Sequence, residues 1–99
     1  MKKVMVPYKV KPDRVAENEK LVKAVYEQLH KEKPKGLQYA TFKLADGVSF
    51  VHVAIIEGEN PLANLSAFKE FQADIKNRCD VPPAPVDVTE IGSYGFFDI

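Results

Sequence analysis

Two apolar runs joined by a turn occupy the centre of the chain, at residues 36–57. Asp46 and Gly47 separate the runs, and such a pair between β-branched and aromatic residues is the strongest short-range signal for a β-hairpin. Both residues tolerate the positive φ that a type I′ turn requires. The second run, residues 48–56, is apolar at nearly every position, which predicts that both of its faces are covered.

The length of the turn decides which side chains share a face of this hairpin. A two-residue loop at Asp46 and Gly47 places Thr41 opposite His52 and brings Tyr39 to the same face. A three-residue loop reverses this arrangement, because a shift by one residue moves every side chain to the opposite face. We predict the two-residue loop.

The residues before the hairpin predict a strand and then a helix. Residues 4–10 alternate, and the side chains expected on one face are Val4, Val6, Tyr8 and Val10. Asp13 suits the N-cap position of a helix that continues to about Glu32. Asn18 lies on the apolar stripe of this helix and needs a hydrogen-bond partner there. The other members of the stripe are Val15, Val22, Val25, Tyr26 and Leu29.

After the hairpin, the pattern predicts a second helix, a connector and a last strand. Apolar residues recur at helical spacing from residue 64 or 66 to residue 78, and Gln72 lies within the apolar face. Residues 80–85 contain three prolines, which predicts an extended connector with little strand pairing. Residues 86–97 alternate and predict a long final strand that bends at Gly92 or Gly95.

The predicted order is β-α-β-β-α-β, the split pattern of the ferredoxin-like α+β fold. We expect one domain over residues 1–99, with a four-stranded antiparallel sheet and both helices on one face. The other face then exposes apolar residues of the hairpin, either Val51, Val53 and Ile55 or Phe50, Ala54 and Ile56. A monomer rarely leaves such a patch open. We expect a homodimer whose helix-free sheet faces pack together, with residues 94–97 reaching across to the partner.

Composition and charge exclude several classes of partner. The chain has 14 basic and 14 acidic residues and a formal net charge of +0, so neither nucleic acid nor a membrane surface is an expected partner. The apolar runs are far shorter than the ~18 residues of a membrane span, and no signal-peptide pattern is present. Cys79 is the single cysteine, and no His/Cys cluster has metal-ligand spacing. We expect a cytoplasmic protein without metal or cofactor.

Four short motifs lie at the start of the first helix, in the second and third strands and in the second helix. They are Val10-Lys11-Pro12, Gly36-Leu37-Gln38-Tyr39, Phe50-Val51-His52-Val53 and Phe68-Lys69-Glu70-Phe71. With the final strand, they resemble the antibiotic-biosynthesis-monooxygenase-like group of dimeric α/β barrel proteins over nearly the whole chain. The resemblance implies a homodimer with a pocket between sheet and helices, and some members oxidise quinol or polyketide aromatics without metal or flavin. Other relatives degrade haem with a set of Asn, Trp and His, but the absence of tryptophan here disfavours that activity.

His52 is the candidate catalytic residue. It lies in the middle of an apolar strand, where it could act as a general base or orient a ligand, because imidazole titrates near neutral pH. The alternative is a neutral core histidine bonded to a side chain across the sheet. We predict that it is buried on the helix-facing side and borders a cavity, since an unpaired polar group there costs ~1 to 3 kcal/mol.

Five other residues are candidates for lining a pocket around the histidine. Tyr8, Tyr39 and Tyr94 come from three predicted strands and offer aromatic walls and phenolic donors to a flat ligand. Otherwise they are core or dimer-interface aromatics. Asn18 and Gln72 lie on the two helical stripes and, if both face the sheet, reach the same cavity. Otherwise they are amides with hydrogen-bond partners at a helix rim.

Two classes of function are compatible with these residues. The first is a cofactor-independent monooxygenase for an aromatic or quinol-type small molecule, where the substrate supplies the electrons and His52 is catalytic. The second is a non-catalytic ligand-binding or structural dimer on the same scaffold, since fold does not fix function. An open cavity lined by His52 and other polar groups favours the first. Side chains that fill this space favour the second.

Overall fold

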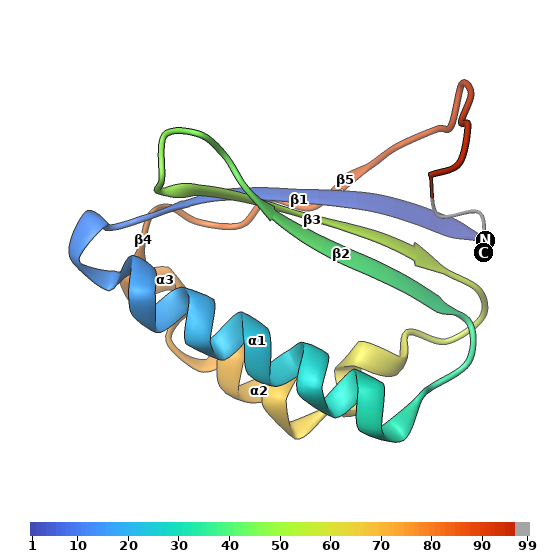
Figure 1. Ribbon diagram of the computed structural model, residues 1–99, viewed down its shortest axis with the longest axis horizontal. Coiled ribbons are helices and arrows are strands. Elements are labelled where there is room, and N and C mark those ends of the chain that lie inside the picture. Colours follow the sequence, from blue (N-terminus) through green and yellow to red (C-terminus); the bar gives the residue numbers. More distant parts are fainter. Residues whose placement is uncertain (97–99) are drawn as a thin grey trace.

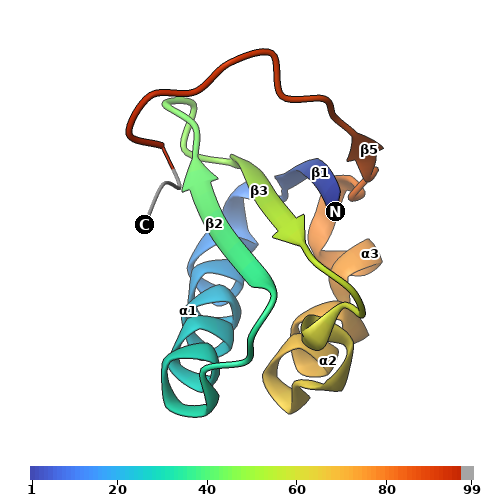
Figure 2. The ribbon, with the colours of Figure 1, turned by 90° about the vertical axis from the view of Figure 1, so that its right-hand side faces the viewer.

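The computed structural model describes residues 1–96 and has an α+β architecture (Figure 1). Its helices and strands are β1 (Lys2–Val10), α1 (Val15–Glu32), β2 (Leu37–Lys43), β3 (Ser49–Ile56), α2 (Ser66–Ala73), α3 (Ile75–Arg78), β4 (Cys79–Val81) and β5 (Val86–Asp87), with 3₁₀ turns at Pro12–Arg14 and Pro61–Asn64. The sheet is antiparallel with the order β2-β3-β1-β4, and β5 also pairs with β1. The helices lie on one face of the sheet (Figures 1 and 2). The predicted ferredoxin-like fold is confirmed.

Alternation along the strands separates a helix-facing side from a helix-free side. Burial in β3 alternates at every residue, and the buried members are Phe50, His52, Ala54 and Ile56. In β1 the buried residues are Val4, Tyr8 and Val10, which belong to the face predicted from the sequence. Of the two sets that the sequence left open, it is Val51, Val53 and Ile55 that lie on the helix-free side.

The hairpin has the predicted register but a longer loop. Thr41 pairs with His52, as expected for a two-residue turn. The last backbone bond runs from the Leu44 N–H to the Ser49 carbonyl at 2.8 Å, so residues 45–48 form the loop. Two additional residues preserve the parity of the pairing, which is why the register was predicted correctly although the turn was not.

Asp46 stabilises this loop through its side chain. Only one member of the expected type I′ pair has a positive φ, namely Gly47 at 78°. The Asp46 carboxylate instead accepts hydrogen bonds from the backbone N–H groups of Val48 and Ser49 at 3.0 and 2.8 Å. A hydrogen bond from the Ser49 hydroxyl lowers the pKa of the Asp46 carboxyl most, and these two backbone bonds lower it further.

The first helix begins one residue later than predicted. Asp13 lies inside the 3₁₀ turn opened by Pro12, and the N-cap position of α1 is held by Arg14. The Arg14 guanidinium donates to both carboxylate oxygens of Glu17, at 3.0 and 2.7 Å, and to Asp74 at 2.7 Å. The start of α1 is thereby tied to the junction of α2 and α3.

The proline-rich connector is paired at its beginning. Cys79–Val81 forms β4 against Lys9 and Val10 of β1, so the prediction of little strand pairing is wrong there. Beyond β4 the prolines lack backbone donors. Ala84 nevertheless donates its N–H to the Pro7 carbonyl at 3.4 Å.

The predicted long final strand is also wrong. Only Val86–Asp87 forms a strand, β5, and residues 88–96 pass over the helix-free side of the sheet (Figure 2). Two glycines interrupt the alternating pattern, and Gly95 has a φ of 65° that a strand does not contain. Phe97, the end of the predicted strand, lies outside the described residues.

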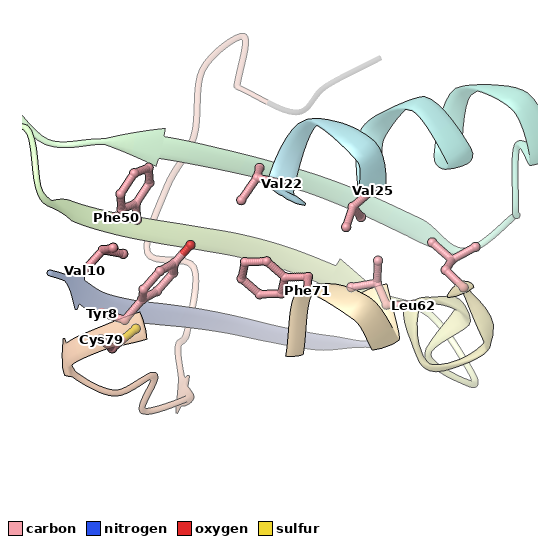
Figure 3. Packing of buried hydrophobic residues seen from close by; sticks show 9 residues of the cluster. Tyr8, Val10, Val22, Val25, Phe50, Leu62, Phe71 and Cys79 are labelled. Atoms are coloured by element: carbon pink, nitrogen blue, oxygen red, sulfur yellow. The ribbon is translucent and has the colours of Figure 1, made fainter. Parts of the chain in front are cut away.

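Tyr8 lies at the centre of the core between sheet and helices (Figure 3). Its ring stacks on Phe50 with centroids 5.5 Å apart and meets Phe71 edge-on at 6.2 Å. Such aromatic pairs contribute beyond the burial of their area. The buried members of this cluster are Tyr8, Val10, Val22, Val25, Phe50, Leu62, Leu65, Phe71 and Cys79. The tyrosine therefore joins β1, β3 and α2.

The helix-free side carries an apolar band across three strands. Strand pairing places Phe42 beside Val51, and it places Ala40 and Met5 on either side of Val53. Phe42 and Met5 are 45% and 38% exposed. Although residues 88–96 pass over this side of the sheet, the band remains partly exposed on a single chain.

Gly36→Ala is expected to destabilise the fold more than Gly58→Ala. Gly36 and Gly58 have similar φ values, +80° and +79°, so both substitutions introduce the same left-handed strain of about 1 kcal/mol. A Cβ at Gly36 would also lie 2.7 Å from the Glu57 carbonyl oxygen, whereas one at Gly58 meets nothing within 4 Å. We expect a total loss of roughly 2 kcal/mol or more for Gly36→Ala in urea-induced unfolding. Equal losses in the two variants would contradict this explanation.

Candidate functional site

A cavity of about 450 Å³ lies between the helix-facing side of the sheet and the helices α2 and α3. Side chains of β1, β2 and β3 line it from the sheet, and Pro82, Pro83 and Pro85 line it from the connector. Most of the remaining lining is aliphatic or aromatic. The polar side chains that line the cavity are Tyr8, Tyr39, His52, Asn60 and Gln72, together with Lys2 and Lys76. The cavity is thus apolar with a few polar groups, as expected of a small-molecule site.

His52 is the most buried titratable side chain of this lining after Tyr8, at 4% exposed. Its Nε2 lies 2.7 Å from the Tyr8 hydroxyl. Its Nδ1 lies 2.6 Å from the Tyr39 hydroxyl and 2.8 Å from Thr41 Oγ1. Both nitrogens are therefore engaged by side chains of neighbouring strands, as the register of the sheet requires.

The hydrogen bonds continue from Tyr8 into the helical layer. The Asn18 amide nitrogen donates to the Tyr8 hydroxyl at 3.0 Å, and the Asn18 oxygen accepts from Arg78 Nε at 2.9 Å. Arg78 also donates through Nη2 to the Phe71 carbonyl at 2.8 Å. Asn18 and Arg78 are both 0% exposed. A buried chain of side chains thus connects α1, the end of α3 and the sheet.

Four rings stack along the same line. Tyr8 and His52 have centroids 5.2 Å apart, His52 and Tyr39 5.5 Å, and Tyr39 and Tyr26 5.5 Å. The Tyr26 hydroxyl also lies 2.7 Å from Thr41 Oγ1. Stacking fixes the ring planes, and the hydrogen bonds fix the positions of the polar atoms within them.

Burial favours the uncharged forms of the histidine and tyrosines in this hydrogen-bonded network. It lowers the pKa of His52 from 6.5 to about 4. It raises the pKa of Tyr8 to about 12, although the hydrogen bond from Asn18 acts in the opposite direction. It also raises the pKa of Tyr26 to about 12 and that of Tyr39 well above its ordinary value. The network therefore presents neutral hydrogen-bonding groups to the cavity.

Four of the predicted site residues line one cavity. His52 lies on the helix-facing side of the sheet, as predicted, together with Tyr8 and Tyr39, and Gln72 lines the cavity from an exposed position on α2. Asn18 is buried behind Tyr8 and acts on the cavity only through it. The placement of Tyr94 is wrong, because the final strand does not form and the side chain is 100% exposed.

Arg78 and Thr41 complete the network, and the sequence did not mark them as site residues. Thr41 was noted only as the cross-strand neighbour of His52. Arg78 ends the predicted second helix, where it follows Phe71 by seven residues and so shares its helical face. That spacing was the available signal, although an arginine at a helix end usually lies in solvent.

Acidification should destabilise the protein through His52. The folded-state pKa of about 4 lies below the ordinary 6.5, so the neutral histidine stabilises the fold above pH 6.5 and this stability disappears as pH falls toward 4. The shift corresponds to about 3 kcal/mol. We therefore expect the difference in unfolding free energy between the parent and His52→Gln to shrink by this amount between pH 7 and pH 4.

The comparison with His52→Gln removes the contribution of other groups. Glu17, Asp46 and Asp74 also have lowered pKa values and lose stability on acidification, but they do so in both proteins. Chemical denaturation at several pH values measures the difference. A difference that stays constant with pH would show that His52 keeps an ordinary pKa.

Residues 1–96 contain no group of three or more His, Cys, Asp or Glu side chains that could hold a metal ion. Among the described helices, none has the length and apolar character needed to cross a membrane.

No family model and no curated protein matches the chain. Several solved structures share its fold, including a provisionally assigned antibiotic biosynthesis monooxygenase from Nitrosomonas europaea. That protein is 16% identical, with a TM-score of 0.73, and the match covers 90% of this chain and 88% of the other. A similarly assigned protein from Bacteroides thetaiotaomicron gives a TM-score of 0.77 at 14% identity, with coverage of 91% and 89%.

The fold also occurs in a protein with a different activity. The L-rhamnose mutarotase of Formosa agariphila matches with a TM-score of 0.59 at 14% identity and covers 95% of this chain and 99% of its own. The resemblance to antibiotic biosynthesis monooxygenases is thus confirmed as one of fold, and the chain has the ferredoxin-like fold of these structures.

Proposed function

We propose that the protein binds a flat aromatic small molecule in the cavity beside His52 and oxygenates a quinol-type substrate without a cofactor. The observation that carries the proposal is an open apolar cavity whose polar lining includes His52, Tyr8 and Tyr39 in one hydrogen-bonded set. An open cavity of this kind was the condition that favoured an enzyme over a structural dimer.

The dimensions and chemistry of the cavity support an aromatic ligand. A volume of about 450 Å³ lies within the ~300 to 1,000 Å³ that ligand sites usually occupy. Phe68, Phe71 and Tyr39 supply aromatic surface, and Val4, Val6, Ala54, Ile56, Leu62 and Ile75 supply aliphatic surface. A sugar, which is the substrate named for the mutarotase neighbour, could bind the polar side chains of Asn60, Gln72, Lys2 and Lys76, but its hydroxyl groups would lack partners along these walls.

His52 acts in this proposal by positioning the two tyrosines. Both of its nitrogens already contact protein groups, so a substrate atom cannot reach either one directly. A pKa of about 4 also makes the imidazole a weak base toward a phenol. Of the two roles considered from the sequence, ligand orientation therefore fits the geometry better than general base catalysis.

The reaction balances without an external reductant. A hydroquinone and one molecule of oxygen give a hydroxyquinone and one molecule of water. One oxygen atom forms a bond to a ring carbon, and the other leaves in water with two hydrogens of the substrate. The substrate supplies all the electrons, and the protein supplies an apolar site with fixed hydrogen-bonding groups.

Ligand binding without catalysis is the second candidate. It is favoured by the same engagement of both His52 nitrogens, since the cavity then contains no free base. Oxygen consumption with a panel of hydroquinones separates the two candidates. No turnover by the folded parent protein would overturn the oxygenase and leave the binding function.

His52→Gln is expected to lower kcat/KM for oxygen consumption by about a hundredfold, because the tyrosines lose the partner that positions them. Tyr94→Phe is the control, since it removes an exposed phenolic hydroxyl outside the cavity and should change the rate less than about twofold. Circular dichroism checks that both variants remain folded. Full activity in His52→Gln would exclude His52 from the mechanism.

We also propose that two copies of the chain pair through their helix-free sheet faces. The apolar band around Val53, with Met5 and Phe42 exposed, supports this arrangement because monomers rarely leave such a band in water. The cavity lies on the opposite side of the sheet, so pairing leaves it accessible within each copy.

Val53→Glu should convert this dimer to a monomer, because it places a charge at the centre of the band. Val81→Glu is the control, since Val81 is an exposed apolar residue of β4 away from Val53. Light scattering at micromolar concentration measures the molar mass of each protein. A monomeric parent would refute the dimer, and a dimeric Val53→Glu variant would place its interface elsewhere.

A further inference from the structure

The buried hydrogen-bond chain has a direction, which is set by Arg78. A guanidinium group donates hydrogen bonds and has no acceptor. Arg78 Nε lies 2.9 Å from the oxygen of Asn18, so the amide must present its oxygen to Arg78 and its nitrogen to Tyr8. The orientation of the amide is thereby fixed by chemistry.

The direction continues through Tyr8 to His52. The Tyr8 oxygen accepts a hydrogen from Asn18 at 3.0 Å, so its own hydrogen points to its other partner, His52 Nε2, at 2.7 Å. Nε2 is then an acceptor and carries no proton. A neutral imidazole with a free Nε2 has its proton on Nδ1.

A protonated Nδ1 can only donate, so the Tyr39 and Thr41 oxygens are the acceptors in its two contacts, at 2.6 and 2.8 Å. The hydrogens of both hydroxyl groups must therefore find acceptors elsewhere. Thr41 has a further partner in Tyr26, whereas Tyr39 lines the cavity. The hydrogen left over is therefore available at Tyr39, on the cavity side.

We propose that Arg78 is a positioning residue that fixes the Nδ1-protonated form of His52, so that the Tyr39 hydroxyl donates to a carbonyl or oxyanion of the ligand. The ligand class is then a flat aromatic molecule with an acceptor oxygen, such as a quinone carbonyl or a quinolate. The direction of the hydrogen bonds does not depend on the proposed function. Only the ligand class rests on the proposed function.

The burial of Arg78 is otherwise hard to explain as packing alone. Among the described residues no carboxylate forms an ion pair with it, because Glu17 and Asp74 are bonded to Arg14. Glu17 and Asp74 interact with Arg78 electrostatically without a direct ion pair, and a buried charge that lacks a direct partner is costly. Its guanidinium lies 5.2 Å from the Phe71 ring centroid, and within residues 1–96 its Nη1 has no hydrogen-bond partner. A cation at the far end of the chain favours negative charge at the cavity end.

Asn18→Asp provides the sharpest test of direction. One oxygen of the new carboxylate accepts from Arg78, and the other accepts the Tyr8 hydrogen in place of the amide donor. Tyr8 then accepts from His52 Nε2, which must carry the proton. We expect ¹⁵N-histidine NMR at neutral pH to show the Nδ1-protonated form in the parent and the Nε2-protonated form in Asn18→Asp.

Arg78→Lys and Arg78→Met are the supporting pair. Lysine keeps a donor toward Asn18 and should retain the Nδ1-protonated form of His52. Methionine lets the Asn18 amide rotate and should give a mixture of the Nδ1- and Nε2-protonated forms. His30, the other histidine, lies on the exposed part of α1 and serves as an internal reference. An Nε2-protonated His52 in the parent, or an unchanged form in Asn18→Asp, would overturn the proposed direction even if Arg78→Met fails to fold.

The ligand class is tested with 1,4-naphthoquinone and naphthalene, which share a ring system but differ in acceptor oxygens. Tyr39→Phe should weaken naphthoquinone binding by about tenfold and leave naphthalene binding within about twofold. Chemical-shift titration measures both, and Tyr94→Phe is the matched loss of a hydroxyl outside the cavity. Equal effects on the two probes would overturn the acceptor requirement. Failure of both probes to bind would overturn the proposed function. The NMR result on His52 would still decide the direction of the buried hydrogen bonds.

Discussion

The site depends on one buried contact, the hydrogen bond from Arg78 to Asn18. A fully buried guanidinium needs hydrogen-bond acceptors. Arg78 finds them in the Asn18 amide of α1 and the Phe71 carbonyl of α2. The amide in turn reaches Tyr8, which is also the ring at the centre of the core. Stability and site geometry are thus coupled through the same side chain, so that the polar atoms at the cavity are held by the packing of both layers.

Desolvation determines what these atoms can do. The burial that fixes the rings also lowers the pKa of His52 to about 4 and raises the pKa of Tyr39, so charge transfer between them is unfavourable at neutral pH. His52 and the tyrosines bonded to it are consequently better suited to holding a hydrogen-bond donor in place than to removing a proton from a substrate. A preorganised donor in an apolar site stabilises charge that develops on a substrate oxygen. That property agrees with a reaction in which the substrate supplies the electrons.

The sequence predicted the parts of the molecule that obey a regular period. The apolar run of β3 left both of its faces open, and the need of His52 for polar partners indicated which face is buried. Helical spacing placed Asn18 in the core, and Gln72 lines the cavity from an exposed position on α2. The predicted long final strand does not form, because a strand can pair only with a free edge of the sheet. Part of the edge of β1 is already paired with β4. Tyr94 was misplaced with that strand. Arg78 was missed because an arginine at a helix end usually lies in solvent, and its acceptors, the Asn18 amide and the Phe71 carbonyl, come from two different helices.

The fold alone does not choose between the activities found on it, since structures named as monooxygenases and as a mutarotase share it. The choice is made by a few polar groups on an otherwise apolar wall. Here the tyrosines and His52 satisfy each other, and the surplus hydrogen is at Tyr39. A ligand with many hydroxyl groups would need several partners, whereas a planar ligand with one acceptor oxygen needs only this one. The limited polarity of the cavity is therefore itself the source of its selectivity.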